Sequence, residues 1–418
     1  MQLLVAIFIV VTVAWTIAST YLSLRQSTFV QDHRDTVPVD FATTVAPDEH
    51  RRAAEYTLAG ERITRSKTVT EAALSVAWAC GGINLLYGTL AATIPQSLTR
   101  GVAFLIATGI VGTIAGLPFR IYRTFRLERR FGFNRTTPLT FIADTIKRAV
   151  LALTIAVPLL YIVLWIMQSA AGLWWLYTWV GLVILMILAP PVYVRLIAPR
   201  FNRFEPLADT YLRNRIERLL AHSGFRASGL FTMDASRRTA HGNAYFTGFG
   251  KSKRIVLFDT LLKRSPPKEV EAIVAHELGH FKYHHVLFGL ARNAVILFAA
   301  LGLFGWFAKQ HWLLPSFGVD YRDDALVLFV CMLLASLVEP LAGLLNNWIS
   351  RRNEYEADDY ACRMVGVEPL VSALTRLARD NASTLTPDPW YALVHYSHPP
   401  VPLRVRNLRD TQTRRRKP

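Results

Sequence analysis

Residues 276–307 read HELGHFKYHHVLFGLARNAVILFAALGLFGWF, so a metal-binding pattern runs directly into an apolar segment. His276 and His280 are four residues apart and, on a helix, lie one turn apart on the same face. Both imidazoles can therefore bind one Zn²⁺, with Glu277 pointing toward its open position. This pattern is typical of zinc metallopeptidases, and two chance histidines on a solvated helix are the alternative explanation.

The residues before the motif predict that it lies on a helix. Ser265 suits an N-cap and Pro266 suits the first helical position. An apolar stripe leads into the motif and consists of Val270, Ile273 and Val274. His284 continues the four-residue spacing, but it lies about 12 Å along the helix from His276, too far to share a metal. We expect a polar contact at the membrane boundary for His284.

A candidate third ligand follows in the segment Asn353–Asp358, where Glu354 and Asp358 are again four residues apart. Glu354 can complete a catalytic His₂Glu site, and Asp358 can accept an N–H from a ligating imidazole. Glu356 points elsewhere in this arrangement. The alternative is a solvated acidic helix face that follows Arg351 and Arg352.

The composition indicates a membrane protein, since 52% of the 418 residues are hydrophobic. Seven stretches are long enough to cross a bilayer, and the first is read as an uncleaved anchor because it lacks a basic start and an obvious cleavage site. They are Leu3–Leu24, Ala72–Ile94, Val102–Leu117, Val150–Met167, Leu173–Val194, Val286–Phe307 and Ala325–Leu345.

The distribution of Lys and Arg predicts the orientation. The connections 25–71 and 120–148 are rich in Arg and are placed inside, whereas 95–101, 168–172 and 308–324 carry few net positive charges and are placed outside. The N-terminus is then external, and both candidate zinc-binding segments are cytoplasmic.

This distribution explains most of the formal net charge of +17, and no nucleic-acid motif accompanies it, so a nucleic-acid partner is not expected. The basic tail after residue 413 is expected to be disordered near anionic lipid headgroups. Cys80, Cys331 and Cys362 share no metal-binding spacing and are read as small core residues.

The candidate metal ligands lie close to the membrane. His280 precedes the sixth stretch by six residues and Glu354 follows the seventh by nine, which places both about 9–14 Å from the hydrocarbon. This position suits a substrate cleaved beside a membrane anchor or a lipid. Polar residues within the stretches either line a chamber or join helices: Asn84, Arg120, Glu339, Asn346 and Asn347.

Between the fifth stretch and the HExxH helix, the pattern favours a small sheet. Leu230–Met233 and Arg254–Phe258 are predicted strands, and His241–Gly250 is predicted to be an irregular strand. An edge strand here could hold an extended peptide through main-chain hydrogen bonds.

Together these residues resemble the type I CAAX prenyl proteases, which are seven-span zinc metalloproteases. Besides the two zinc-binding segments, the resemblance rests on the stretches Glu128–Asn134, Ile197–Phe204, His241–Phe246, Arg254–Leu262 and Ser397–Pro400. It implies a mainly α-helical bundle of seven transmembrane helices around a chamber, with a zincin-like cytoplasmic catalytic domain that contains a small β-sheet.

The resemblance also implies roles for individual residues. His276, His280 and Glu354 would hold one Zn²⁺ per chain, and Glu277 would act as the general base. Asp358 would orient a ligand, while Asn243 and His398 would lie near the substrate and the tetrahedral oxyanion. Related proteases remove the C-terminal tripeptide after a prenylated cysteine.

We therefore expect membrane-associated peptide hydrolysis, with a peptide or protein substrate that is prenylated or membrane-anchored. The alternatives are a broad-specificity quality-control protease and, more remotely, a seven-span transporter or receptor with a structural zinc site. The predicted divisions are a membrane domain (1–200), a zinc protease segment (201–285), spans six and seven (286–345), and a cytoplasmic segment with the third ligand (346–418). The Arg- and Ala-rich composition favours a bacterial plasma membrane over the endoplasmic reticulum.

Overall fold

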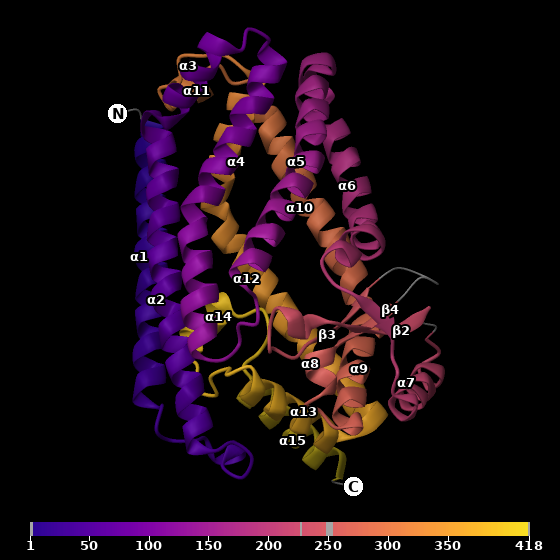
Figure 1. The fold of residues 1–418 in the computed structure, drawn as a ribbon. Coiled ribbons are helices and arrows are strands. Elements are labelled where there is room, and N and C mark those ends of the chain that lie inside the picture. The colour runs from indigo at the N-terminus through magenta and orange to yellow at the C-terminus, as the bar shows by residue number, and fades with distance from the viewer. Residues whose placement is uncertain (1–2, 226–227, 248–253, 417–418) are drawn as a thin grey trace.

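The computed structural model describes residues 3–225, 228–247 and 254–416, and the fold is mainly helical (Figure 1). Seven helical segments are long and apolar enough to cross a membrane. Four of them are single helices: Leu3–Asp32 (α1), Pro138–Ser169 (α5), His285–Phe307 (α10) and Asp324–Val365 (α12). The segment Pro47–Thr93 consists of α2 (Pro47–Ala77) and α3 (Ile83–Thr93), which are joined by a π-helical turn. The segment Ser97–Glu128 begins with α4 (Ser97–Tyr122), and Trp174–Arg200 begins with α6 (Trp174–Val192). The seven predicted spans correspond to these segments in order.

The basic connection 25–71, for which the sequence predicted only a position inside, is mostly helical. Helix α1 continues to Asp32, and α2 begins at Pro47. The backbone N–H of Ala46, just before α2, donates to the Glu49 carboxylate over 2.9 Å. Polar groups join the two helices at and beyond the end of the apolar stretch: Ser23 donates to Glu61 over 2.5 Å, and Arg65 donates to Ser27 over 3.0 Å. The helical hairpin therefore extends beyond the hydrophobic part of the bundle.

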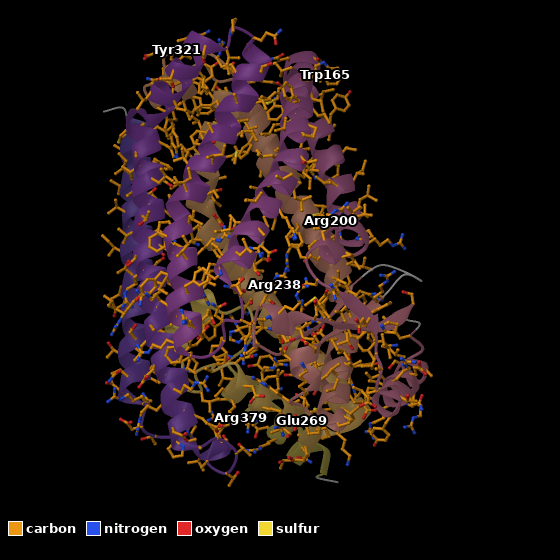
Figure 2. All side chains as sticks on the ribbon, viewed as in Figure 1. Trp165, Arg200, Arg238, Glu269, Tyr321 and Arg379 are labelled. Carbon is orange, nitrogen blue, oxygen red and sulfur yellow. The ribbon has the colours of Figure 1, made fainter. Side chains whose placement is uncertain are left out.

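The bundle has two distinct ends. Tyr321 and Trp165 lie at one end, together with α3 and the short helix α11 (Leu313–Ser316), whereas Glu269 and Arg379 lie at the other (Figure 2). Buried side chains of several helices pack together toward the first end, among them Phe8, Tyr87, Phe104 and Phe317. The three connections predicted to be external all belong to this end (Figure 1).

At the opposite end lies a mixed four-stranded sheet with strand order β1-β2-β4-β3. Its strands are Phe204–Pro206 (β1), Gly229–Met233 (β2), Ala244–Thr247 (β3) and Arg254–Phe258 (β4). Strands β2 and β4 are parallel, and the other two pairings are antiparallel. Two strands match the predictions, β1 was missed, and β3 forms part of the predicted irregular strand, whose residues 248–250 lie outside the described residues. Strand β3 is an edge strand.

Helices cover this sheet and share one hydrophobic core with it. They are Thr210–His222 (α7), Asp259–Leu262 (α8), Pro267–Lys282 (α9), Val367–Asp380 (α13) and Val401–Arg416 (α15), whereas Pro389–His395 (α14) packs against α1 and α12. The core joins residues from both sides of spans six and seven in the sequence, such as Ile255, Val274, Leu370 and Val405. The two cytoplasmic segments of the prediction thus fold around a common interior.

Two local predictions were wrong. Helix α9 starts one residue later than predicted, with Pro266 as its N-cap and Pro267 in the first helical position. Proline is favoured in that position, and the sequence offers two adjacent prolines for it. The tail was expected to be disordered, but α15 continues to Arg416. Val405 and Leu408 anchor this helix in the core, and its regular structure extends from there.

Candidate metal centre

The crossing of α9 and α12 builds the centre, and Gly279 permits it. A Cβ atom at Gly279 would lie 2.8 Å from the Cα atom of Ala357, closer than two packed carbons can approach. Without a side chain at this position, the two backbones come together and the histidines of α9 face Glu354 of α12. The glycine of the HELGH motif is therefore a packing requirement.

Two imidazole nitrogens and the carboxylate of Glu354 come together at this crossing. Nε2 of His280 lies 3.3 Å from Nε2 of His276 and 3.3 Å from Oε1 of Glu354. Nε2 of His276 lies 3.5 Å from Oε2 of Glu354. Ligand atoms held 2.0–2.1 Å from a single tetrahedral zinc ion are about 3.3–3.4 Å apart, which is the separation of the two histidine nitrogens. The two Glu354 distances involve different carboxylate oxygens, and with one ligand atom taken from each residue all three atoms lie within 4.8 Å of one another, close enough to hold one metal ion.

The burial of Glu354 supports the same interpretation. This residue is only 2% exposed, and its Oε2 atom has no hydrogen-bond partner among the residues that the structure describes. The guanidinium of Arg404 lies 3.2 Å from this oxygen and compensates part of its charge, and a metal ion between the carboxylate and the two imidazoles would compensate more. The donor set of two imidazoles and one carboxylate is that of a catalytic zinc site with a free position.

Asp358 and Arg404 form a layer behind the ligands. The Nδ1 atom of His276 lies 2.9 Å from Oδ1 of Asp358, which is fully buried. Arg404 donates to both oxygens of Asp358 over 2.8 and 2.6 Å, and its Nη1 atom lies 3.2 Å from Glu354. Burial lowers the pKa of His276, but hydrogen bonds to Asp358 and Glu354 outweigh it and raise this pKa to about 9.

Sequence reasoning missed Arg404, which balances the charge of two buried carboxylates. It lies 46 residues after Asp358, on a different helix, so no spacing connects the two. One signal was available: Arg404 lies next to Val405 and four residues before Leu408, both of which are core residues on a mostly polar helix.

The three ligand residues line a cavity of about 320 Å³ together with the other predicted site residues Glu277, Asn243 and His398. Leu370, Leu374 and Leu377 of α13 form an apolar part of its wall. Burial raises the pKa of the Glu277 carboxyl group, which brings it closer to the range of a general base. The cavity thus combines a metal-binding face, a basic carboxylate and an apolar wall.

Asn243 and His398 reach this cavity from two distant parts of the sequence. Asn243 immediately precedes β3, its carbonyl accepts the Phe258 N–H over 3.0 Å, and its Oδ1 atom accepts the N–H of Ala244 over 2.8 Å. The His398 Nδ1 atom lies 2.9 Å from Oε1 of Glu354, although its side chain is 66% exposed. The exposure leaves His398 room to meet a substrate.

Membrane helices hold the short helix α14, which leads to His398. Tyr391 donates to Glu61 of α2 over 2.8 Å, and Asn347 of α12 donates to the Val394 carbonyl over 2.7 Å. Arg351 donates to the Tyr396 carbonyl over 2.6 Å. The segment before His398 is thereby tied to two different membrane helices.

The polar residues predicted within the spans have several roles. Glu339 and Asn347 line a cavity of about 480 Å³ between α1, α2, α12 and α14 that is rich in Ser and Thr. Asn347 also binds α14, so it both lines the cavity and joins helices. Asn84 bonds Asp320 over 3.2 Å at the opposite end of the bundle, and Arg120 lies over the Phe141 ring.

A His₂Glu group beside a basic carboxylate, carried on helices continuous with a seven-span bundle, defines the protein as an integral membrane zinc metalloprotease. Residues 26–203 match the family model described as CAAX prenyl protease N-terminal, five membrane helices, and residues 206–412 match peptidase family M48. The chain belongs to the CAAX prenyl protease 1 family of M48 peptidases.

Individual relatives agree with this assignment. The CAAX prenyl protease 1 homolog of Arabidopsis thaliana is 32% identical over 94% of both chains. CAAX prenyl protease 1 of Saccharomyces cerevisiae is 35% identical over 76% of this chain and 73% of its own. The crystal structure of S. mikatae Ste24p superposes with a TM-score of 0.89 at 29% identity, covering 97% of this chain and 98% of that one.

These matches confirm the predicted family, the predicted fold class and the predicted metallopeptidase activity. The chain is a multi-pass membrane protein, and its substrates are peptides. The remote alternative, a transporter or receptor with a structural zinc site, does not agree with the peptidase match across residues 206–412.

Proposed function

We propose that this protease binds one Zn²⁺ per chain through His276, His280 and Glu354 and cleaves membrane-anchored substrates near a prenylated cysteine. The observation that carries the proposal is the grouping of one ligand atom each from His276, His280 and Glu354 within 4.8 Å of one another, on the wall of a cavity that also contains Glu277. The prenylated substrate is suggested by the names of the relatives, which are CAAX prenyl proteases.

In the proposed mechanism, His276, His280 and Glu354 would hold zinc, which would supply a Lewis acid for the scissile carbonyl and for the attacking water molecule. Glu277 accepts the proton of the attacking water and passes it to the leaving amine. Asp358 accepts the Nδ1–H of His276, which directs the Nε2 lone pair of that ring toward the metal position. His398 donates a hydrogen bond to the developing oxyanion.

Substrate preference is the direct test of the prenyl proposal. The purified protein should cleave a farnesylated CaaX peptide faster than its unprenylated twin, because the lipid adds binding energy beside the scissile bond. Both peptides are offered in the same detergent, and the inactive variant Glu277→Gln measures background cleavage. Equal kcat/KM values would favour the alternative, a broad-specificity quality-control protease for membrane proteins.

We propose that Asn243 binds the substrate backbone where it pairs with the edge strand β3. Asn243→Ala should lower kcat/KM about tenfold to a hundredfold, equivalent to about 1.4–2.7 kcal/mol, with zinc content unchanged. Steady-state kinetics on zinc-loaded protein provides the measurement. Wild-type kinetics would leave this residue with only its hydrogen bonds to its own strand.

The orientation predicted from the Lys and Arg distribution remains a proposal, with the metal centre in the cytoplasm and a bacterial plasma membrane favoured over the endoplasmic reticulum. The division into four sequence segments is likewise proposed. A reporter fused at Arg130 or after Arg409 should register as cytoplasmic, and one fused at Asp320 as external. The reverse pattern would place the metal centre outside.

A further inference from the structure

The ligand His280 has a contact on the side facing away from the proposed metal position. Its Nε2 atom faces the other two ligands, 3.3 Å from each. Its second nitrogen, Nδ1, lies 3.0 Å from Nδ1 of His285, and the Nε2 atom of His285 lies 3.1 Å from Oε2 of Glu356. These three side chains form a continuous chain from α12 through the start of α10 to the metal ligand on α9.

The carboxylate of Glu356, at the end of this chain of side chains, determines which atom donates each hydrogen bond. A carboxylate only accepts hydrogen bonds, so the His285 nitrogen beside Glu356 carries a hydrogen. In a neutral imidazole the other nitrogen is then an acceptor, and Nδ1 of His285 accepts the Nδ1–H of His280. This leaves the Nε2 lone pair of His280 free for a metal. We propose that His285 is a positioning residue that fixes the tautomer and ring orientation of the zinc ligand His280, with Glu356 fixing His285.

The backbone around His285 is built to hold this position. His284 adopts a left-handed conformation, with φ of 57°, and turns the chain from α9 into α10. His285 is the first residue of α10, its side chain is 8% exposed, and its ring stacks on Tyr283 with ring centroids 5.8 Å apart. Tyr283 in turn hydrogen-bonds to Arg363 of α12. The sixth membrane helix therefore starts at a residue that contacts a metal ligand.

Each histidine ligand thus has its own partner. His276 faces Asp358, a fully buried carboxylate held by Arg404, whereas His280 faces a neutral imidazole whose carboxylate partner is 43% exposed. This arrangement explains two residues that sequence reasoning left without a role, His285 and Glu356. The inference rests on the proposed zinc ligands and adds a residue outside the HExxH motif that sets metal affinity.

Two substitutions separate positioning from simple packing. The side-chain oxygen of Asn reaches the place of the His Nδ1 atom, so His285→Asn keeps an acceptor for His280. The side-chain amide of Gln reaches the place of Nε2, so His285→Gln keeps a partner for Glu356 but leaves His280 without its acceptor. His284→Asn is the matched control, because that side chain is exposed and Asn tolerates the left-handed conformation.

The measurement is the zinc dissociation constant of the detergent-purified, full-length protein, determined by competition with a chromogenic chelator. Loss of a partner behind a metal ligand typically weakens metal binding about 10–100-fold. We expect this loss for His285→Gln, affinity within about threefold of wild type for His285→Asn, and no change for His284→Asn. Visible spectra of the Co²⁺-substituted proteins should show an altered ligand field for His285→Gln alone.

The outcomes have distinct meanings. Wild-type zinc affinity in His285→Gln would overturn the inference, and so would equal losses in His285→Gln and His285→Asn, which would indicate a packing role. If the wild-type chain itself bound no zinc, the proposed function would fail first, independently of His285.

Discussion

Glu277→Gln should abolish peptide hydrolysis while the protein keeps its fold and its zinc. Gln occupies the same space as Glu, but it cannot accept the proton of the attacking water. The carboxyl group lies in the cavity with the three ligands, and none of the three short ligand distances involves it, so the metal should remain bound. We expect residual turnover of no more than a few percent, measured with a fluorogenic peptide, and one zinc per chain by elemental analysis.

Glu217→Gln, on the exposed face of α7, provides a matched control for a charge-removing Glu-to-Gln change and should retain full activity. Turnover clearly above a few percent in Glu277→Gln would mean that another group takes the proton. Loss of zinc from this variant would instead show that Glu277 is a ligand.

Glu354→Ala should lose the metal, because it leaves only the two imidazoles of α9. It also removes a carboxylate 3.2 Å from the buried guanidinium of Arg404, so the free energy of unfolding should decrease as well. Elemental analysis after dialysis against a weak chelator measures the zinc content, and thermal unfolding measures the stability. Both should fall together.

The control for this variant is Glu368→Ala, which removes an exposed carboxylate at the start of α13. It should keep one zinc per chain. One tightly bound zinc in Glu354→Ala would require a different third ligand and would contradict the proposed site.

The parts of the site predicted from sequence are those encoded by local helix geometry. His276, Glu277 and His280 lie within five residues, and Glu354 and Asp358 are one turn apart, so each pattern could be recognised before their meeting was known. The seven spans could be predicted for a similar reason, since each is a continuous apolar stretch. The placement of Asn243 and His398 relied on the family resemblance.

The parts that were missed depend on contacts between distant segments. His285 and Glu356 are 71 residues apart, and Arg404 approaches Asp358 only after α15 packs against α12 and α13. The charges of the connection 25–71 were used only to predict its side of the membrane, and they gave no sign of the helical extension of α1 and α2, where Ser23, Glu61 and Tyr391 satisfy one another across three helices. A buried polar network carries no sequence period, so it becomes visible only in three dimensions.

Helix α12 connects the far end of the bundle to the metal centre, because it continues without interruption for 42 residues. Pro340 removes one helical hydrogen bond and is a point where the helix bends readily. Glu354 lies fourteen residues farther along, about 21 Å, so a bend of one degree at Pro340 moves this ligand by about 0.4 Å. Zinc–ligand distances tolerate only about 0.2 Å. A bound ion would therefore join α12 to the histidines of α9 and would restrict bending of the seventh membrane helix at Pro340.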